Sequence, residues 1–172
     1  MPERHVVLIG LPGAGKTAAG RISARLLDTL FTDLDQAIVR ETGRTVPELF
    51  LERGEALFRA LERDAMNRAL ASAPHVIAPG GGWAAQEGNL TRARPDALLV
   101  FLRVSPDVAA ARLAEDRDRP LLQGDPLGRL EHLLGEREVF YHQADVEVDT
   151  DALTPTAVAD VVAGLARTHG GW

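Results

Sequence analysis

A phosphate-binding motif stands near the start of the chain. The segment GLPGAGKT, residues 10–17, matches the pattern G-x-x-x-x-G-K-[ST] in full. Its glycines let backbone N–H groups close around nucleotide phosphates, while Lys16 can span the β- and γ-phosphates and Thr17 can offer its hydroxyl to Mg²⁺. The motif follows a predicted strand and opens a predicted helix, which is the context in which it binds phosphate. ATP or GTP binding is therefore the first function that the sequence predicts.

Two carboxylates lie two residues apart in the segment FTDLDQA, at the end of the second predicted strand. If the strand continues through Leu34, Asp33 and Asp35 lie on one face and point toward the edge where ligands of open α/β sheets bind. One carboxylate would then serve a metal and the other a substrate hydroxyl. The alternative is that one of them is the N-cap of the next helix, a common use of Asp.

Arginines recur in three polar segments. In residues 52–64, ERGEALFRALERD, charges of both signs fall at helical spacings, which taken alone predicts a solvated face with ion pairs around Arg59. Residues 115–125 are highly charged and contain a proline and a glycine, a composition typical of a mobile loop. Small-molecule kinases need such a lid, because water in the site would compete for the γ-phosphoryl group. Arg137 is a further helical arginine, whose simplest interpretation is a surface ion pair.

The elements that must position these residues alternate along the chain. Nearly unbroken apolar runs predict strands buried on both faces, and the periods between them predict helices, so we expect a parallel α/β sheet covered by helices on both sides. The predicted strands are residues 5–10, 30–33, 75–78, 97–104 and 145–149. The predicted helices are residues 16–27, 35–42, 46–51, 55–71, 106–114, 127–141 and 156–168, with a frayed tail after them.

Composition limits the class of protein. A chain of 172 residues with 45% hydrophobic residues fits one compact domain, and a net charge of −6 argues against a protein that coats nucleic acid. The absence of cysteine excludes disulfides and thiol chemistry. The apolar run near the N-terminus is too short for a signal peptide or a membrane span, so we expect a cytoplasmic enzyme or binding domain.

Other nucleotide-binding classes fit less well. A switch GTPase would need a guanine-reading N-K-x-D element, and the sequence has none. A large ATPase module would carry a long apolar strand ending in paired acids, which is also absent. A kinase of a small molecule remains.

Six motifs together resemble the shikimate kinase family: GLPGAGKT, DLD, GEALFRALE, GGG, RPLL and ER..FY occur in that family's order and nearly its spacing, from about residue 6 to 155. The resemblance implies one P-loop kinase domain over residues 1–172, with a five-stranded parallel sheet of order 2-3-1-4-5. A helical substrate-binding segment would span about residues 34–62, and a mobile lid about residues 113–125. The implied reaction transfers the γ-phosphoryl group of ATP to the 3-hydroxyl of shikimate in aromatic amino acid biosynthesis, with Mg²⁺ and a monomeric enzyme.

The resemblance also implies roles for individual residues. Asp35 would hold the substrate hydroxyls and act as base, Lys16 and Arg119 would stabilise the transferring phosphate, and Thr17 and Asp33 would face Mg²⁺. The substrate carboxylate would be bound by Arg59 and Arg137, with backbone from Gly80, Gly81 and Gly82. The nucleotide would contact Gly13, Ala14, Gly15, Lys16, Thr17 and Ala18, with Arg112 and Pro155 on either side of adenine.

Two positions depart from the family pattern. Pro79, before the three glycines, lacks an N–H and the hydroxyl that the family usually has there, and Trp83 after them replaces a small or aliphatic residue. Trp83 either reshapes the substrate pocket or only packs beneath the lid. The alternatives are therefore a paralogous kinase of another small polyhydroxy or sugar acid, or a catalytically silent nucleotide-binding regulatory domain. The presence of Lys16, Thr17, Asp33 and Asp35 argues against the silent domain.

Overall fold

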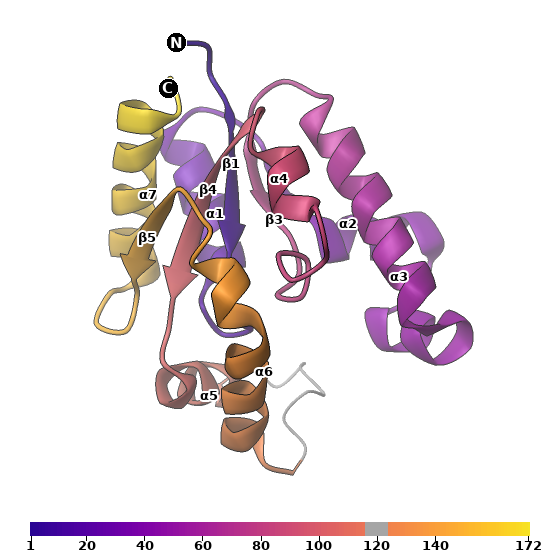
Figure 1. The fold of residues 1–172 in the computed structure, drawn as a ribbon. Helices are drawn as coiled ribbons and strands as arrows, with labels where there is room; N and C mark the ends of the chain where they lie inside the picture. Colours follow the sequence, from indigo (N-terminus) through magenta and orange to yellow (C-terminus); the bar gives the residue numbers. More distant parts are fainter. Residues whose placement is uncertain (116–123) are drawn as a thin grey trace.

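A five-stranded parallel sheet forms the centre of the molecule (Figure 1). The structure is a computed structural model that describes residues 1–115 and 124–172. The strand order is β2-β3-β1-β4-β5, so the predicted fold class and strand order are confirmed. The strands are β1 (His5–Ile9), β2 (Phe31–Asp33), β3 (Val76–Ala78), β4 (Ala97–Arg103) and β5 (Val146–Asp149).

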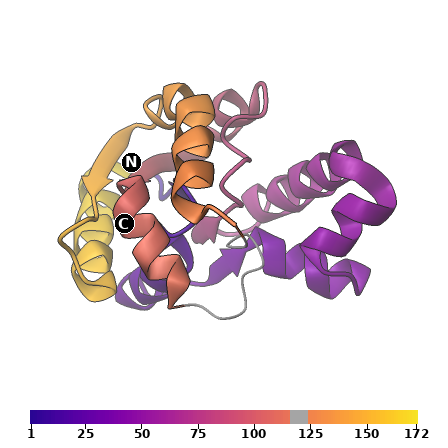
Figure 2. The ribbon, with the colours of Figure 1, turned by 90° about the horizontal axis from the view of Figure 1, so that it is seen from below.

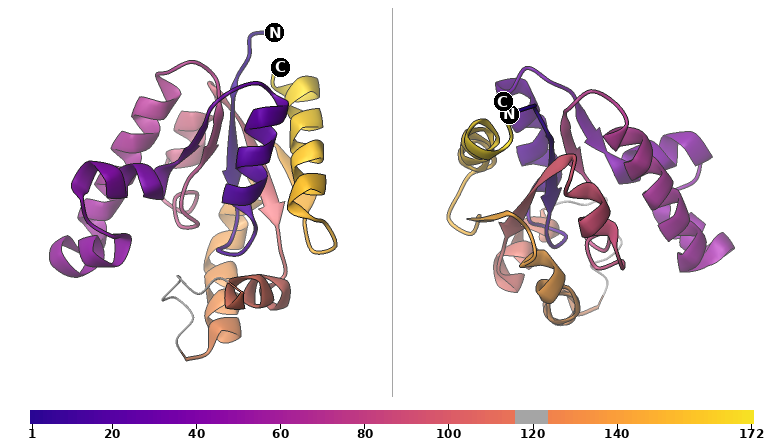
Figure 3. Two further views of the ribbon diagram at one scale, coloured as in Figure 1. Left: turned by 180° about the vertical axis from the view of Figure 1, so that it is seen from behind. Right: turned by 45° about the horizontal axis from the view of Figure 1, so that its top comes forward.

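Helices cover both faces of this sheet. Helices α1 and α7 lie side by side on one face, as Figure 3 shows from behind, and α4 and the end of α6 lie over the other. Helices α2 and α3 extend from the β2 side, while α5 and α6 lie below the carboxyl ends of the strands (Figure 2). The helices are α1 (Lys16–Leu26), α2 (Leu34–Thr42), α3 (Val46–Leu70), α4 (Asn89–Ala93), α5 (Pro106–Ala114), α6 (Pro126–Tyr141) and α7 (Pro155–His169).

The core lies on both faces of the central strands. Every residue of β1 and β3 is buried, as is β4 up to Leu102, which confirms the prediction of strands buried on two sides. The edge strands β2 and β5 are more exposed. Burial on both faces is what an apolar parallel strand achieves under helices on each side.

Capping residues and glycine mark the ends of several helices. The Ser105 hydroxyl accepts from the Val108 N–H and caps α5, and the Thr154 hydroxyl accepts from the Ala157 N–H and caps α7. Gly43 ends α2 in the left-handed conformation, with φ 67°. The two helices predicted over 46–51 and 55–71 form one element, α3, interrupted at Gly54. The short helix α4 was not predicted.

Two expectations about local structure are wrong. The second strand does not continue through Leu34: it ends at Asp33, and Leu34 begins α2, so Asp33 and Asp35 do not share a strand face. The C-terminal tail is not frayed, because the Trp172 indole donates to the carbonyl of Arg4 at 2.9 Å. Within residues 1–115 and 124–172, no helix has both the length and the apolar character needed to cross a membrane.

Candidate active site

The phosphate loop joins β1 to α1 at the carboxyl edge of the sheet. Gly13 and Gly15 both have φ 85°, a conformation that favours glycine, and a Cβ on Gly13 would lie 2.8 Å from the carbonyl oxygen of Ala109 in α5. The Lys16 side chain folds back over the loop, where its Nζ donates to the carbonyls of Gly10 (2.7 Å) and Leu11 (2.9 Å). The predicted nucleotide contacts, residues 13–18, thus lie in this loop and the first turn of α1.

Asp33 caps α2 and also contacts the first turn of α1. Its Oδ1 accepts from the Gln36 N–H at 3.0 Å and caps α2, while its Oδ2 accepts from the Thr17 hydroxyl at 2.9 Å. A hydroxyl and a carboxylate oxygen side by side are hard ligands of the kind Mg²⁺ prefers, beside a loop built for phosphate. In the described part of the chain, no group of three or more His, Cys, Asp and Glu side chains could hold a metal ion. The Thr17 and Asp33 oxygens would suit an ion such as Mg²⁺, which commonly takes one or two protein ligands and keeps water and phosphate oxygens in its shell.

Gly80 brings two carboxyl groups to the edge of β3. A Cβ atom at this position would lie 3.1 Å from both Asp35 Oδ1 and Glu62 Oε1, so a larger residue would push on both carboxyl groups. Asp35 comes from the first turn of α2, and Glu62 from the middle of α3. Asp35 therefore faces the glycine run as predicted, although from a helix and not from a strand.

The other two glycines lie against the two arginines predicted to bind the substrate carboxylate. A Cβ on Gly81 would lie 3.1 Å from Arg137 Nη1, and a Cβ on Gly82 would lie 2.5 Å from Arg59 Nη2. Arg59 is only 12% exposed and Arg137 is half-buried, so neither is a simple surface residue. Helices α3 and α6 thus bring two guanidinium groups to the same short segment.

Glu62 also lies at this site, although the sequence did not indicate it. It is fully buried, whereas its spacing predicted a solvated face, and its Oε2 accepts from Arg59 Nη1 at 2.8 Å. Its Oε1 has no hydrogen-bond partner among residues 1–115 and 124–172. Burial raises the pKa of this carboxyl to about 7, against the hydrogen bond and charge of Arg59, and the nearby charge of Asp35 raises the pKa further. Its spacing to Arg59 was visible in the sequence, but its burial was not.

Tyr141 is a second residue that was not singled out. Its hydroxyl donates to the carbonyl of Gly81 at 2.6 Å, and its ring is fully buried against Phe101. Burial raises its pKa to about 12, while the positive charge of nearby Arg137 acts in the opposite direction. The tyrosine of the ER..FY segment was the available signal, four residues after Arg137 on α6.

The predicted adenine-binding residues come from two neighbouring segments. Arg112 Nη2 donates to the carbonyl of Thr150 at 2.6 Å, and its Nη1 contacts the Thr150 hydroxyl (3.1 Å) and the carbonyl of Gly13 (3.4 Å). Arg112 is thereby fixed between the phosphate loop and the β5–α7 connection, where Pro155 begins α7. Arg119 lies outside the described residues, as do residues 116–123 of the predicted lid.

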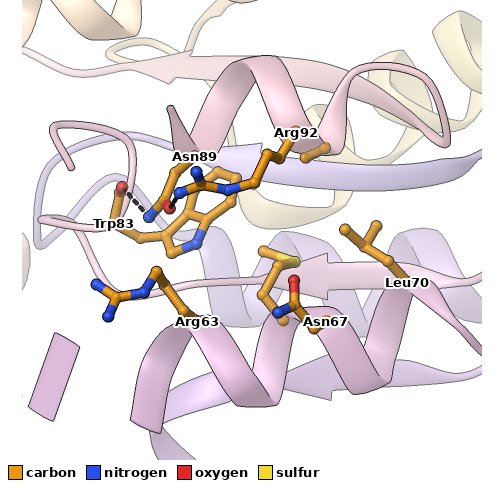
Figure 4. A pocket seen from close by; sticks show the side chains of 8 residues that line it. Arg63, Asn67, Leu70, Trp83, Asn89 and Arg92 are labelled. Atoms are coloured by element: carbon orange, nitrogen blue, oxygen red, sulfur yellow. Dashed lines mark hydrogen bonds between the residues drawn. The ribbon is translucent and has the colours of Figure 1, made fainter. Parts of the chain in front are cut away.

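Trp83 packs away from the glycine run. Its side chain is 1% exposed and lies in a pocket with residues of the second half of α3 and of α4, as Figure 4 shows. Its carbonyl accepts from the Asn89 side chain at 2.9 Å. The pocket is lined by Arg63, Met66, Asn67, Leu70, Trp83, Asn89, Arg92 and Ala93. Neither Arg59, Asp35 nor Arg137 lines it, so the large ring packs between helices.

A sequence model described as shikimate kinase matches residues 12–165, which is most of the chain. The chain belongs to the shikimate kinase family. A shikimate kinase of Thermobifida fusca is 44% identical over 161 residues, with 91% of each chain covered. A shikimate kinase of Xanthomonas campestris is 39% identical, with 96% of this chain and 93% of the relative covered.

Solved structures agree with this family membership. The shikimate kinase of Acinetobacter baumannii in complex with shikimate superposes with a TM-score of 0.89 at 32% identity, with 96% of this chain and 94% of that chain covered. A gluconokinase of Sinorhizobium meliloti has a TM-score of 0.62 at 17% identity, covering 99% and 96% of the two chains, and shares the fold alone. The motifs that suggested the shikimate kinase family in the sequence therefore identified it correctly.

Proposed function

We propose that the protein transfers the γ-phosphoryl group of ATP to the 3-hydroxyl of shikimate, giving shikimate 3-phosphate and ADP. The observation that carries this proposal is the arrangement around Gly80–Gly82. Two arginines and a carboxylate, Arg59, Arg137 and Asp35, meet at one glycine run close to a complete phosphate loop. This is the set of groups that a small anionic polyhydroxy acid requires, and the chain belongs to a family of kinases for such an acid.

The substrate carboxylate would bind to Arg59 and Arg137. Guanidinium groups bind carboxylates in a bidentate manner, and a protein of net charge −6 must supply this positive charge locally. Gly81 and Gly82 would complete the site, because each lies against one of the two guanidinium groups. Asp35, beside Gly80, would accept hydrogen bonds from the substrate hydroxyls and orient the 3-hydroxyl for attack.

Phosphoryl transfer needs positioning and neutralisation of charge more than covalent chemistry. Backbone N–H groups of residues 13–18 and the Lys16 ammonium would hold the phosphates of ATP, and Arg119 of the lid would reach the transferring group. Thr17 and Asp33 would hold Mg²⁺, since their side-chain oxygens lie 2.9 Å apart where the start of α1 meets the end of β2. When bound, Mg²⁺ would neutralise charge on the phosphate oxygens. Arg112 and Pro155 would enclose adenine.

Trp83 gives no reason to assign another acceptor. The ring that could have narrowed the substrate pocket packs between α3 and α4. A small-molecule kinase working on free metabolites needs no partner, nucleic acid or membrane, and every group invoked here comes from one chain. We therefore also propose a monomeric cytoplasmic enzyme.

The decisive experiment is a coupled ADP-release assay with ATP, Mg²⁺ and shikimate, quinate or gluconate. We expect turnover with shikimate, and loss of about two orders of magnitude or more in Arg59→Ala and Asp35→Asn. Arg63→Ala is the matched control, because this exposed arginine lies one turn along α3 and lines the pocket of Trp83 instead. Turnover of another acid without shikimate turnover would favour the paralogous kinase. Absence of turnover with every acid, in protein that still binds ATP, would favour the silent domain.

A further inference from the structure

The carbonyl groups of the glycine run are all anchored. Each of the three carbonyls accepts a hydrogen bond from a different residue, so the orientation of the segment is fixed at every peptide. The donors are the Trp83 N–H to Gly80 (3.1 Å), the Gln86 side-chain amide to Gly82 (3.1 Å) and the Tyr141 hydroxyl to Gly81 (2.6 Å). Two of these donors are local, whereas Tyr141 lies 60 residues away, on the last turn of α6.

Tyr141 is held rigidly. Its side chain has no exposed surface, and its ring stacks on Phe101 of β4 with a centroid distance of 5.1 Å and an interplanar angle of 25°. A buried ring packed on the central sheet cannot turn its hydroxyl away without opening the core. The Tyr141 side chain therefore holds the Gly81 carbonyl in a fixed position relative to the central sheet.

The hydrogen bond to the Gly81 carbonyl also fixes the direction of the next backbone donor, the Gly82 N–H. In a planar trans peptide the C=O and the following N–H point in opposite directions, and the structure contains no cis peptide bonds among its described residues. The Gly81 carbonyl points to Tyr141, so the Gly82 N–H points away from it. Gly82 is also the residue whose Cβ would lie 2.5 Å from Arg59 Nη2.

The same hydroxyl has a second neighbour. Arg137 lies one turn earlier on α6, close enough for its positive charge to act against the rise that burial causes in the pKa of the Tyr141 hydroxyl. A Cβ on Gly81 would lie 3.1 Å from Arg137 Nη1, so the guanidinium rests over the peptide that Tyr141 anchors. The Tyr141 hydroxyl thus donates to Gly81 directly beside the guanidinium group of Arg137.

We propose that Tyr141 is a positioning residue for the substrate carboxylate: its hydroxyl holds the Gly81–Gly82 peptide, and so orients the Gly82 N–H, beside the Arg137 guanidinium. The inference rests on the proposed function, since it concerns how that site holds its acid. It predicts that loss of the hydroxyl weakens binding of the acid specifically, because ATP is bound by other elements.

Tyr141→Phe tests this directly, because it keeps the ring on Phe101 and removes only the hydroxyl. We expect KM for shikimate to rise about tenfold and KM for ATP to stay within about twofold. Ser23→Ala is the matched control: it removes another fully buried hydroxyl, which donates to the carbonyl of Ala19 at 2.8 Å within α1. It should leave KM for shikimate unchanged even if the melting temperature falls. Equal effects of Tyr141→Phe on both KM values, or none on shikimate, would overturn the proposal.

A measurement on the unaltered chain complements the variant. Tyr141 is the only tyrosine, so protein labelled with ¹³Cζ-tyrosine gives one resonance from this residue. We expect shikimate to shift that resonance and Mg²⁺-ATP alone to leave it in place. A resonance that ignores shikimate, in enzyme that turns shikimate over, would also overturn the proposal. If wild-type protein turns over a different acid, the proposed function fails, and both measurements with that acid still decide the role of Tyr141.

Discussion

At the scale of single residues, the buried carboxyl group of Glu62 lies beside the glycine run, residues 80–82. Glu62 has no exposed surface, and one of its oxygens accepts from Arg59 while the other faces Gly80. Removing a carboxylate from water is costly, so burial favours the protonated form and raises the pKa from 4.5 to about 7. Arg59 opposes this shift but does not cancel it. The group that orients Arg59 therefore changes charge near neutral pH.

Glu62 makes stability depend on pH in a defined window. Between pH 4.5 and about 7 the unfolded chain has lost a proton that the folded chain still holds, so the free energy of unfolding falls as pH rises. The full contribution is present below pH 4.5, and up to about 3 kcal/mol is lost by pH 7.5. Glu62→Gln removes this titration and keeps the shape of the side chain. Urea unfolding measures the free energy of unfolding of both proteins, and the stability of Glu62→Gln relative to wild type should rise with pH across this window. A difference that does not change with pH would show that Glu62 does not titrate there.

At the scale of elements, Gly54 divides α3 into two parts. Its φ of 79° and ψ of 169° lie in a region that is essentially restricted to glycine, and a Cβ there would meet no atom within 4 Å. The cost of a side chain at this position is therefore backbone strain alone. Residues after the break carry Arg59 and Glu62, and Arg68 in the same part forms an ion pair with Glu41 of α2.

Two glycine-to-alanine substitutions distinguish backbone strain from helix propensity. Gly54→Ala should destabilise the protein by ~1–3 kcal/mol, because alanine does not tolerate this backbone conformation. Gly135→Ala is the matched control: it is inside α6, also meets no atom within 4 Å of a Cβ, and has ordinary helical geometry. It should stabilise by ~0.5–1 kcal/mol. Chemical unfolding measures both, and a Gly54→Ala variant at least as stable as wild type would show that α3 can straighten without cost.

The sequence predicted the elements better than their contacts. Unbroken apolar runs and N-caps are local signals, so five strands, seven helical segments and the break near Gly54 were all visible. Helix α4 was not, because five residues are too few to show a period. The cap that Asp33 forms on α2 is local and was one of the two alternatives. Its contact with Thr17 and the burial of Glu62 depend on which segments the fold brings together. The strand order and the joint site came from resemblance, since spacing alone cannot state which helix faces which glycine.

At the scale of the whole molecule, the sheet has a functional end and a structural end. The phosphate loop and glycine run lie at the carboxyl ends of the strands, while both chain termini meet at the opposite end (Figures 1 and 3). There the Arg4 N–H donates to the carbonyl of Gly170 at 2.8 Å, and Trp172 donates to the carbonyl of Arg4. The Trp172 ring also packs against the hydrophobic core. The last residues thus close the amino end of the sheet.

This separation predicts a variant that loses stability and keeps activity. Trp172→Ala should destabilise the protein by ~1–3 kcal/mol, because it removes apolar contact with the core and a hydrogen bond to Arg4. Trp172→Phe keeps an aromatic ring and loses only the indole N–H, so its melting temperature should lie between those of wild type and Trp172→Ala. Turnover at 25 °C should be unchanged in both, since the site is at the other end of the sheet. An unchanged melting temperature would mean that the tail frays in solution, and a fall in turnover while the variants remain folded would mean that the two ends are coupled through β1 and β4.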